Sequence, residues 1–271
     1  MLGLDVGRRF ALTLARRRYR WGGRRGRIVD WFLCYATPNN HERAVSAEAL
    51  VELFFELVSA ADPDVFVEAG AKEASASVRA TEAAIPEVIA FEANPYTYRR
   101  FAGDLQSAGV DYRHAALSEE NGEVTFLVRR RVDGTPIADG QGSLLIRPDH
   151  EPGYVEATVA SVRLDDAVDA AARTAIWVDV EGAVAEVLGG GRQVLERTDV
   201  AIIEVEEVAR WVGQRWLAPD VVEQLARAGL RAVGRDMQSR WQFNIVFVRD
   251  DLLAMPAVWE RISTWRTTTP T

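Results

Sequence analysis

The sequence predicts an α/β protein built on a doubly wound, mostly parallel β-sheet. Two observations favour this fold class. Short runs rich in β-branched and aromatic residues alternate with runs whose apolar residues recur every three or four positions, as strands and helices do in such sheets. The chain of 271 residues, with 48% hydrophobic and 27% charged residues, is also long enough to bury a sizeable core.

The first half of the sheet is predicted to follow a long helix over residues 43–60. This helix has apolar positions at helical spacing and contains no helix breaker. After a turn at "DPD", the expected elements are a strand at Val65–Glu68, a helix near 75–84, a strand at Val88–Phe91, a helix near 95–108 and a short strand at Asp111–His114.

An inserted hairpin is predicted over about 118–163, where the alternation of strands and helices is interrupted. The runs "GEVTFLVRRR" and "YVEATVASVRL" alternate like antiparallel strands, and a turn-rich loop with "DGTPIADGQGS" joins them. We expect this hairpin to cover a site. The alternation then resumes with a strand at 175–178, a helix over 183–195, a strand at 199–206, a helix over 218–229 and closing strands at 230–235 and 241–250.

The amino-terminal residues 1–42 are expected to form a basic arm in front of a domain over 43–271. Residues 1–30 hold nine arginines against two aspartates, although the whole chain has a net charge of -8. A solvated helical arm is the preferred interpretation, and an arm swapped onto a second subunit would give a homodimer. Contact with an anionic surface or a phosphorylated acceptor is the alternative. The strongly acidic remainder argues against a nucleic-acid partner.

The location of the protein is predicted from its cysteine content and hydropathy. Cys34 is the single cysteine, which excludes an internal disulfide framework and fits a reducing cytoplasm. No run approaches the roughly 20 apolar residues of a membrane helix, and the opening residues lack a convincing signal cleavage site. We therefore expect a cytoplasmic protein with no membrane span.

The ends of the first three predicted strands indicate a cofactor without a phosphate. "VEAGAKEAS" contains one glycine, Gly70, where a dinucleotide fold uses G-x-G-x-x-G to let the backbone approach a pyrophosphate. S-adenosylmethionine has no phosphate, and Glu68 could receive its ammonium group. Glu92 ends the second strand, where one carboxylate can accept hydrogen bonds from both ribose hydroxyls. The residues predicted to contact the cofactor are Glu68, Gly70, Ala71, Glu92, Ala93, His114, Ala115, Ala116 and Asp179, with 114–116 as a small wall for adenine.

These segments resemble the FkbM-type family of class I S-adenosylmethionine-dependent methyltransferases. The matching pieces, in the order of the family, are "VFVEAGAKEASASV", "VIAFEANPYTYRRF", "HAALSEENGEVTF", "VRLDDAVD" and "IWVDVEGAVAEVLGGGRQVLERTDVAIIEVE". The resemblance implies a Rossmann-like, seven-stranded sheet with an antiparallel last strand, helices on both faces, and methyl transfer mostly to hydroxyl groups. The chain departs from the family at three positions, having Glu68, Lys72 and Ala74 where the family usually has Asp, Asn and Gly.

Two carboxylates follow the strand "AIWV", and they are predicted to lie on an active-site rim. Methyl transfer is an in-line displacement, and a hydroxyl acceptor must also lose its proton. Asp179 is the best candidate for the general base, with His114 or His150 as alternatives. Glu181 and Glu204 are expected to act at the same rim and to orient the acceptor. Whether these carboxylates also hold Mg²⁺ is left open by their spacing.

The sequence predicts the chemical class of the acceptor and two tryptophans that could contact it. Trp211 and Trp216 follow the strand at 199–206, where they would either stack on a sugar ring or pack the loop against the core. We expect an O-methyltransferase that acts on a small-molecule or oligosaccharide acceptor, namely a saccharide or similar polyol. A polyketide or macrolide hydroxyl is the alternative substrate, and a non-catalytic scaffold that keeps the fold is the alternative function.

Overall fold

A computed structural model describes residues 40–236, 239 and 241–268 of the chain. The predicted basic arm therefore lies almost entirely outside the described residues, as do Cys34 and any homodimer contact through the arm. Among the residues that are described, no helix is both long enough and apolar enough to cross a membrane.

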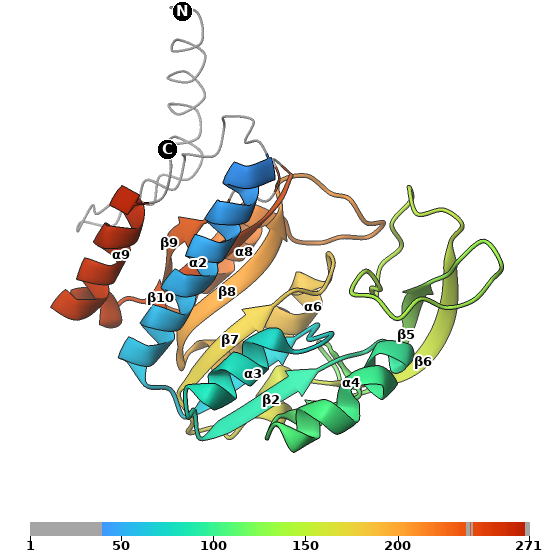
Figure 1. Ribbon diagram of the computed structural model, residues 1–271, viewed down its shortest axis with the longest axis horizontal. Coiled ribbons are helices and arrows are strands. Elements are labelled where there is room, and N and C mark those ends of the chain that lie inside the picture. Colours follow the sequence, from blue (N-terminus) through green and yellow to red (C-terminus); the bar gives the residue numbers. More distant parts are fainter. Residues whose placement is uncertain (1–39, 237–238, 240, 269–271) are drawn as a thin grey trace, which may run out of the picture.

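The main sheet has seven strands in the order β3-β2-β1-β7-β8-β10-β9 (Figure 1). The strands β3, β2, β1, β7 and β8 pair in parallel, whereas β10 is antiparallel to both of its neighbours. This confirms the predicted mostly parallel sheet with an antiparallel last strand. The strands are β1 (Val65–Ala69), β2 (Glu87–Phe91), β3 (Asp111–Arg113), β7 (Thr174–Val178), β8 (Thr198–Glu206), β9 (Leu230–Arg235) and β10 (Gln242–Arg249).

Helices cover both faces of the sheet, which explains why the central strands are apolar without alternation. All residues of β1 and β8 are buried. Figure 1 shows α2 and α3 crossing in front of the sheet, with α6 and α8 behind it. The first face carries α2 (Asn40–Ala61), α3 (Ser75–Glu82), α4 (Pro95–Ser107) and α9 (Pro256–Thr268), and the second carries α5 (Leu164–Ala167), α6 (Val184–Gly189), α7 (Arg192–Leu195) and α8 (Ala218–Arg227).

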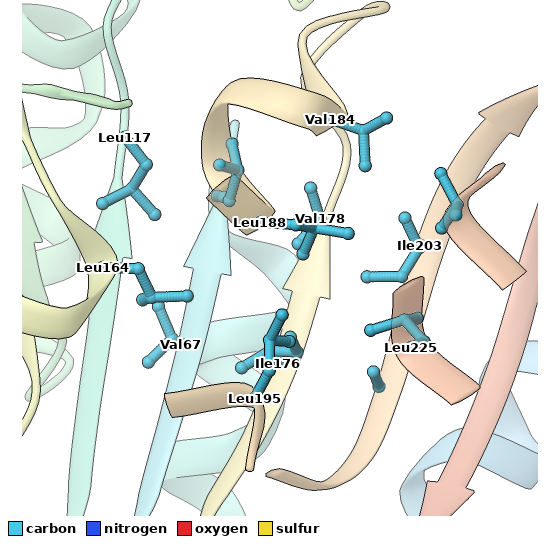
Figure 2. Close-up of a cluster of buried hydrophobic side chains, with 14 of the residues drawn as sticks. Val67, Leu117, Leu164, Ile176, Val178, Val184, Leu188, Leu195, Ile203 and Leu225 are labelled. Atoms are coloured by element: carbon cyan, nitrogen blue, oxygen red, sulfur yellow. The ribbon is translucent and has the colours of Figure 1, made fainter. Parts of the chain in front are cut away.

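The core behind the sheet joins alternate residues of the parallel strands to the short helices. Figure 2 shows Ile176 and Val178 of β7 packed beside Leu188 of α6 and Leu195 of α7. Because consecutive strand residues point to opposite faces, Trp177 faces the other side, where its ring meets Phe54 of α2 edge-on at 5.6 Å. Trp177 therefore packs in the core under α2.

The single helix predicted over Ala183–Leu195 is wrong, because two short helices, α6 and α7, occupy this segment. Glycines separate them, and these glycines pack closely on their neighbours. A β-carbon at Gly190 would lie 2.1 Å from the Ser118 carbonyl oxygen, and one at Gly191 would lie 2.6 Å from a methyl carbon of Leu164. The tertiary contact thus requires glycine where a continuous helix would prefer a side chain.

The helix α9 was not among the predicted elements. Its buried residues Val258 and Ile262 are four positions apart, and Trp265 follows three positions later. This is helical spacing, and α9 uses it to pack against α2.

The predicted hairpin is confirmed as β5 (Gly122–Arg129) and β6 (Tyr154–Val162), which pair antiparallel. A short strand, β4 (Ala116–Leu117), joins β6 in parallel, so the insertion forms its own three-stranded sheet. Figure 1 shows this sheet beside the main one, with the loop 130–153 extending from it. The insertion is therefore anchored directly after β3, at the edge where the predicted cofactor residues lie.

Candidate active site

A pocket lies at the carboxyl ends of β1, β2 and β7, which is the edge where α/β sheets bind ligands. Six of the nine predicted cofactor residues line it, namely Gly70, Glu92, Ala93, Ala115, Ala116 and Asp179. The hairpin and its loop supply a further wall, made of Phe126, Asp139, Gly140, Gly142 and Leu144. The parallel strand ends thus bring three distant sequence segments together, and the insertion covers them.

The loop after β1 turns sharply at Gly70. This glycine has a φ of 77°, in the left-handed region that suits glycine. The amides of Gly70 and Ala71 donate to the Phe91 carbonyl at 3.0 and 2.9 Å, which ties the loop to the end of β2. Lys72 and Ala74 also have positive φ values, of 48° and 51°. The two positions where this chain departs from the Asn and Gly of the family are thus left-handed, the conformation that those residues adopt most easily.

Glu68 is buried beneath this loop and is already hydrogen-bonded within the protein. Its Oε2 accepts hydrogen bonds from the Ser77 amide at 2.8 Å and from the Ser77 hydroxyl at 2.6 Å. Burial raises the pKa of Glu68 to about 7 despite these two donors. The carboxyl group therefore holds the first turn of α3 against the loop. A contact between Glu68 and a ligand ammonium stays a prediction, and Glu68 does not line the pocket.

Glu92 is held in one orientation at the wall of the pocket. Its Oε2 accepts from the Lys72 amide at 2.8 Å, and its Oε1 accepts from the Asn94 amide at 2.6 Å. Burial raises the pKa of Glu92 to about 7, which these two hydrogen bonds oppose. Each carboxylate oxygen has a second lone pair, so the fixed group can still accept a hydrogen bond from a ligand.

His114 lies in an aromatic stack beside the pocket and does not line it. Its ring stacks on Tyr98 at 4.9 Å, and Tyr98 stacks on Tyr112 at 5.1 Å. The Tyr112 hydroxyl donates to the Lys72 carbonyl at 2.6 Å, so the stack also supports the loop after β1. The next two residues, Ala115 and Ala116, form the small wall itself.

The predicted acidic rim is assembled from β8 and the loop after β7. Carboxylate oxygens of Asp179, Glu181 and Glu204 all lie within 4.8 Å of one another. Asp179 shares a hydrogen bond with Glu204, and burial raises the pKa of both groups. Burial, together with the charge of Asp179, raises the pKa of Glu181 to about 7. Such oxygen ligands fit Mg²⁺, which would polarise an acceptor oxygen if these three residues held it.

Glu206 extends this acidic rim and was missed by the sequence analysis. It lies two positions beyond Glu204, on the same side of β8, and is only 1% exposed. Its Oε2 accepts a hydrogen bond from Gln214 at 2.5 Å, whereas Oε1 has no partner among the described residues. The alternation of "EVE" at the end of a strand was the signal that could have found it.

The aromatic residues predicted at the acceptor side do not line the pocket. Trp211 is 5% exposed and packs on Gly182, where a β-carbon would lie 2.7 Å from the ring. Trp216 packs against the main core. The His150 ring nitrogen Nδ1 lies 2.8 Å from the Tyr154 hydroxyl within the covering loop and hairpin. The structure thus gives all three side chains packing contacts, and acceptor binding by them stays a prediction.

Comparison with known proteins identifies one family. The family described as "Methyltransferase FkbM domain" matches residues 64–267, which include the whole pocket and the acidic rim. No curated protein gives a significant match.

Three of the solved structures that resemble this chain are as follows. A magnesium protoporphyrin IX methyltransferase from Synechocystis PCC 6803 with bound SAH is 10% identical, with a TM-score of 0.41 over 90% of this chain and 99% of that one. WbdD is 12% identical, with a TM-score of 0.44 over 78% of this chain and 41% of that one. The N-terminal domain of EvdMO1, solved with SAH and D-fucose, is 12% identical, with a TM-score of 0.39 over 78% and 84%.

Proposed function

Because the chain belongs to the FkbM methyltransferase family, we propose that it transfers a methyl group from S-adenosylmethionine to a hydroxyl of a saccharide or similar polyol. One observation carries this proposal. Glu92, the candidate ribose ligand, and Asp179, the candidate base, line the same pocket although they lie 87 positions apart in the sequence. A cofactor held at Glu92 would thus share its pocket with Asp179, the member of the acidic rim that lines it.

The cofactor contacts follow from the walls of the pocket. Glu92 would accept hydrogen bonds from the ribose hydroxyls, and Ala115 with Ala116 would contact the adenine ring. The methionine portion would lie beside Gly70, which lines the pocket next to β7. Near Glu92 the pocket combines a fixed carboxylate with the small apolar residues Ala93, Ala115 and Ala116, and Asp139 and Asp179 line it elsewhere. Acidic and apolar walls suit a nucleoside that carries no phosphate.

In this proposal, residues of the protein align the acceptor hydroxyl and remove its proton. S-adenosylmethionine supplies, when bound, an electrophilic methyl group on a sulfonium. Asp179 would take the proton of the acceptor hydroxyl while Glu181 and Glu204 accept hydrogen bonds from neighbouring hydroxyls. The raised pKa of Asp179 makes it a stronger base than an exposed aspartate, provided that it is ionised. The covering loop would exclude water during transfer.

Calorimetric titration with S-adenosylmethionine and its demethylated product tests the cofactor assignment. Saturable binding at micromolar to millimolar concentration is expected, and no binding at millimolar concentration would favour the non-catalytic scaffold. Incubation with methyl-labelled cofactor and an extract of the source cells then tests the acceptor. Label in a saccharide supports the proposal, whereas label in a polyketide or macrolide would replace the acceptor class.

A further inference from the structure

Asn94 connects the candidate ribose ligand, the start of α4 and the loop that covers the pocket. Its backbone amide donates to Glu92 Oε1 at 2.6 Å. Its side-chain Oδ1 accepts from the amides of Tyr96 and Thr97 at 3.0 and 3.4 Å, which caps α4. Its Nδ2 donates to the carbonyls of Ile137 and Asp139 at 3.2 and 3.4 Å. The buried Asn94 side chain therefore caps α4 through its Oδ1 and hydrogen-bonds the loop through its Nδ2.

The same part of the loop is held by two further side chains. Thr97 Oγ1 donates to the Asp139 carbonyl at 3.3 Å, from the first turn of α4. Arg129 Nη1, at the end of β5, donates to Asp139 Oδ2 at 3.1 Å and also to Gln141 Oε1. Polar contacts to α4 and β5 thus converge on Asp139, which is one of the residues that line the pocket.

The far end of the covering segment is fixed at the acidic rim. Ser143 is 2% exposed, and its hydroxyl donates to the Glu181 carbonyl at 2.7 Å. Between Asp139 and Ser143 the chain crosses the pocket, and Gly140 and Gly142 line it there. The covering segment therefore spans from the candidate cofactor side to the candidate acceptor side, with a polar anchor at each end.

Glu92 is only 5% exposed, and the covering segment lines the same pocket as its carboxylate. A nucleoside bound at Glu92 would therefore lie between the strand ends and this segment. We propose that Asn94 is a positioning residue that latches the covering segment, residues 137–143, across the pocket that Glu92 lines, and that the cofactor enters and leaves when this latch opens. The identity of the ligand rests on the proposed function, whereas the latch itself is a property of the ligand-free protein.

The two roles of Asn94 can be separated by substitution. Asn94→Ser keeps a good helix cap, because a serine hydroxyl accepts from the same amides, but its shorter side chain has no donor at the position of Nδ2. Asn94→Ala removes both the cap and the latch. Asn121→Ser is the matched control, because Asn121 also makes side-chain hydrogen bonds at the insertion, to Asp166 and Arg163, at its opposite end.

Hydrogen exchange of the ligand-free protein tests the latch without any cofactor. The amides of Ile137 and Ser143 donate to Arg129 and Leu127, so their exchange reports opening of the covering segment. Asn94→Ser should speed their exchange about tenfold, as expected for loss of two hydrogen bonds to the loop. Asn94→Ala should speed it equally and should also lower the melting temperature, and Asn121→Ser should exchange like the wild type. Wild-type exchange in Asn94→Ser, with fast exchange only in Asn94→Ala, would overturn the latch.

Stopped-flow dissociation of S-adenosylhomocysteine tests the link to the ligand. Asn94→Ser should release it about tenfold faster, and Thr97→Val, which removes one hydrogen bond of the same latch, about threefold faster. Unchanged release from an Asn94→Ser protein with fast loop exchange would overturn the role of the latch in ligand passage. If the wild type binds no cofactor, the proposed function fails, and the exchange experiment alone decides whether the latch exists.

Discussion

The backbone of Asp179 runs directly against Gly70, so that a β-carbon at Gly70 would lie 1.8 Å from the Asp179 carbonyl oxygen. The Asp179 amide also donates to the Ala69 carbonyl at 3.0 Å. The turn that begins the candidate cofactor site is therefore fixed against the residue proposed to act on the acceptor. Only glycine permits this approach, because of both the missing β-carbon and the φ of 77°.

Gly70→Ala should destabilise the protein by roughly 2–5 kcal/mol. The left-handed backbone costs an alanine about 1–2 kcal/mol, and relieving the contact with Asp179 costs about 1–3 kcal/mol more. Urea unfolding measures the change. Gly103→Ala is the control, because a β-carbon there meets nothing within 4 Å and Gly103 lies in α4. That variant should be neutral or stabilised by about 0.5–1 kcal/mol. Equal effects of the two substitutions would contradict the close approach.

Much of the fold could be predicted because its strands are buried on both faces. Runs such as Val65–Ala69 and Thr198–Glu206 are then continuous apolar segments, and their ends can be placed within one or two residues. Gly70, Glu92 and Asp179 could be grouped for the same reason, since the carboxyl ends of parallel strands meet at one edge.

The parts that escaped prediction depend on tertiary contacts. The covering segment, residues 137–143, has no hydrophobic period, and its path is set by Asn94 at one end and the Glu181 carbonyl at the other. Likewise, the break between α6 and α7 depends on how closely Gly190 approaches Ser118, which are far apart in the sequence. No local pattern encodes either contact.

The pH dependence of stability should report the buried carboxyl of Glu206. Burial, assisted by the charges of Glu181 and Asp179, raises its pKa from 4.5 to about 7. Between these values the folded protein keeps a proton that the unfolded chain has lost, so stability falls as the pH rises from 4.5 to 7 and then levels off. Glu206→Gln should remove this contribution, with a gain of about 1–2 kcal/mol over the wild type at pH 8 and little gain at pH 4.5.

Chemical denaturation of both proteins across this pH range measures the effect of Glu206→Gln. The amide can still accept the hydrogen bond from Gln214, so the packing is kept and the low-pH values serve as an internal control. Parallel stability curves for the two proteins would show that Glu206 is ionised in the folded state well below pH 7.

Lys72 is expected to tune the proposed base. Burial raises the pKa of Asp179, and the positive charge of Lys72 opposes this rise. Lys72→Met keeps the aliphatic stem and the amide that donates to Glu92 but removes the charge. The acidic limb of the pH dependence of turnover should therefore move to higher pH, because Asp179 would stay protonated longer. Lys72→Arg keeps the charge and should keep the profile. An unchanged profile in Lys72→Met would remove Lys72 from this role.

Glu92→Ala should weaken S-adenosylmethionine binding by roughly 1.5–3 kcal/mol, through loss of charge-assisted hydrogen bonds to the ribose. The substitution also leaves the amides of Lys72 and Asn94 without their acceptor, so the fold must be checked by its melting temperature. Glu92→Gln separates the loss of ribose binding from damage to the fold. Glutamine keeps the size of the side chain and an acceptor for one of these amides, but it has no charge. An unchanged dissociation constant in folded Glu92→Ala would show that the ribose lies elsewhere.

Asp179→Asn should lower turnover by roughly 10²- to 10⁴-fold, the usual range for losing a positioned base. The amide keeps the size of the side chain and can still hydrogen-bond Glu204, but it cannot take a proton from the acceptor. Cofactor binding should change little, because asparagine keeps the size of the Asp179 side chain at the pocket wall and the proposed ribose contact is on Glu92. Single-turnover methylation under saturating cofactor measures the step itself.

The competing interpretation of Asp179 is purely structural, and the acidic rim makes it testable. Removing one negative charge from a cluster with Glu181 and Glu204 relieves repulsion, so Asp179→Asn should be at least as stable as the wild type above pH 7. If Asp179→Asn is more stable than the wild type, binds cofactor normally and fails to transfer methyl, Asp179 acts in the chemistry and lowers the stability of the fold. Near-normal transfer by the folded variant would instead exclude Asp179 as the base. His114, whose ring is stacked on Tyr98 beside the pocket, and His150 would then be the next residues to replace.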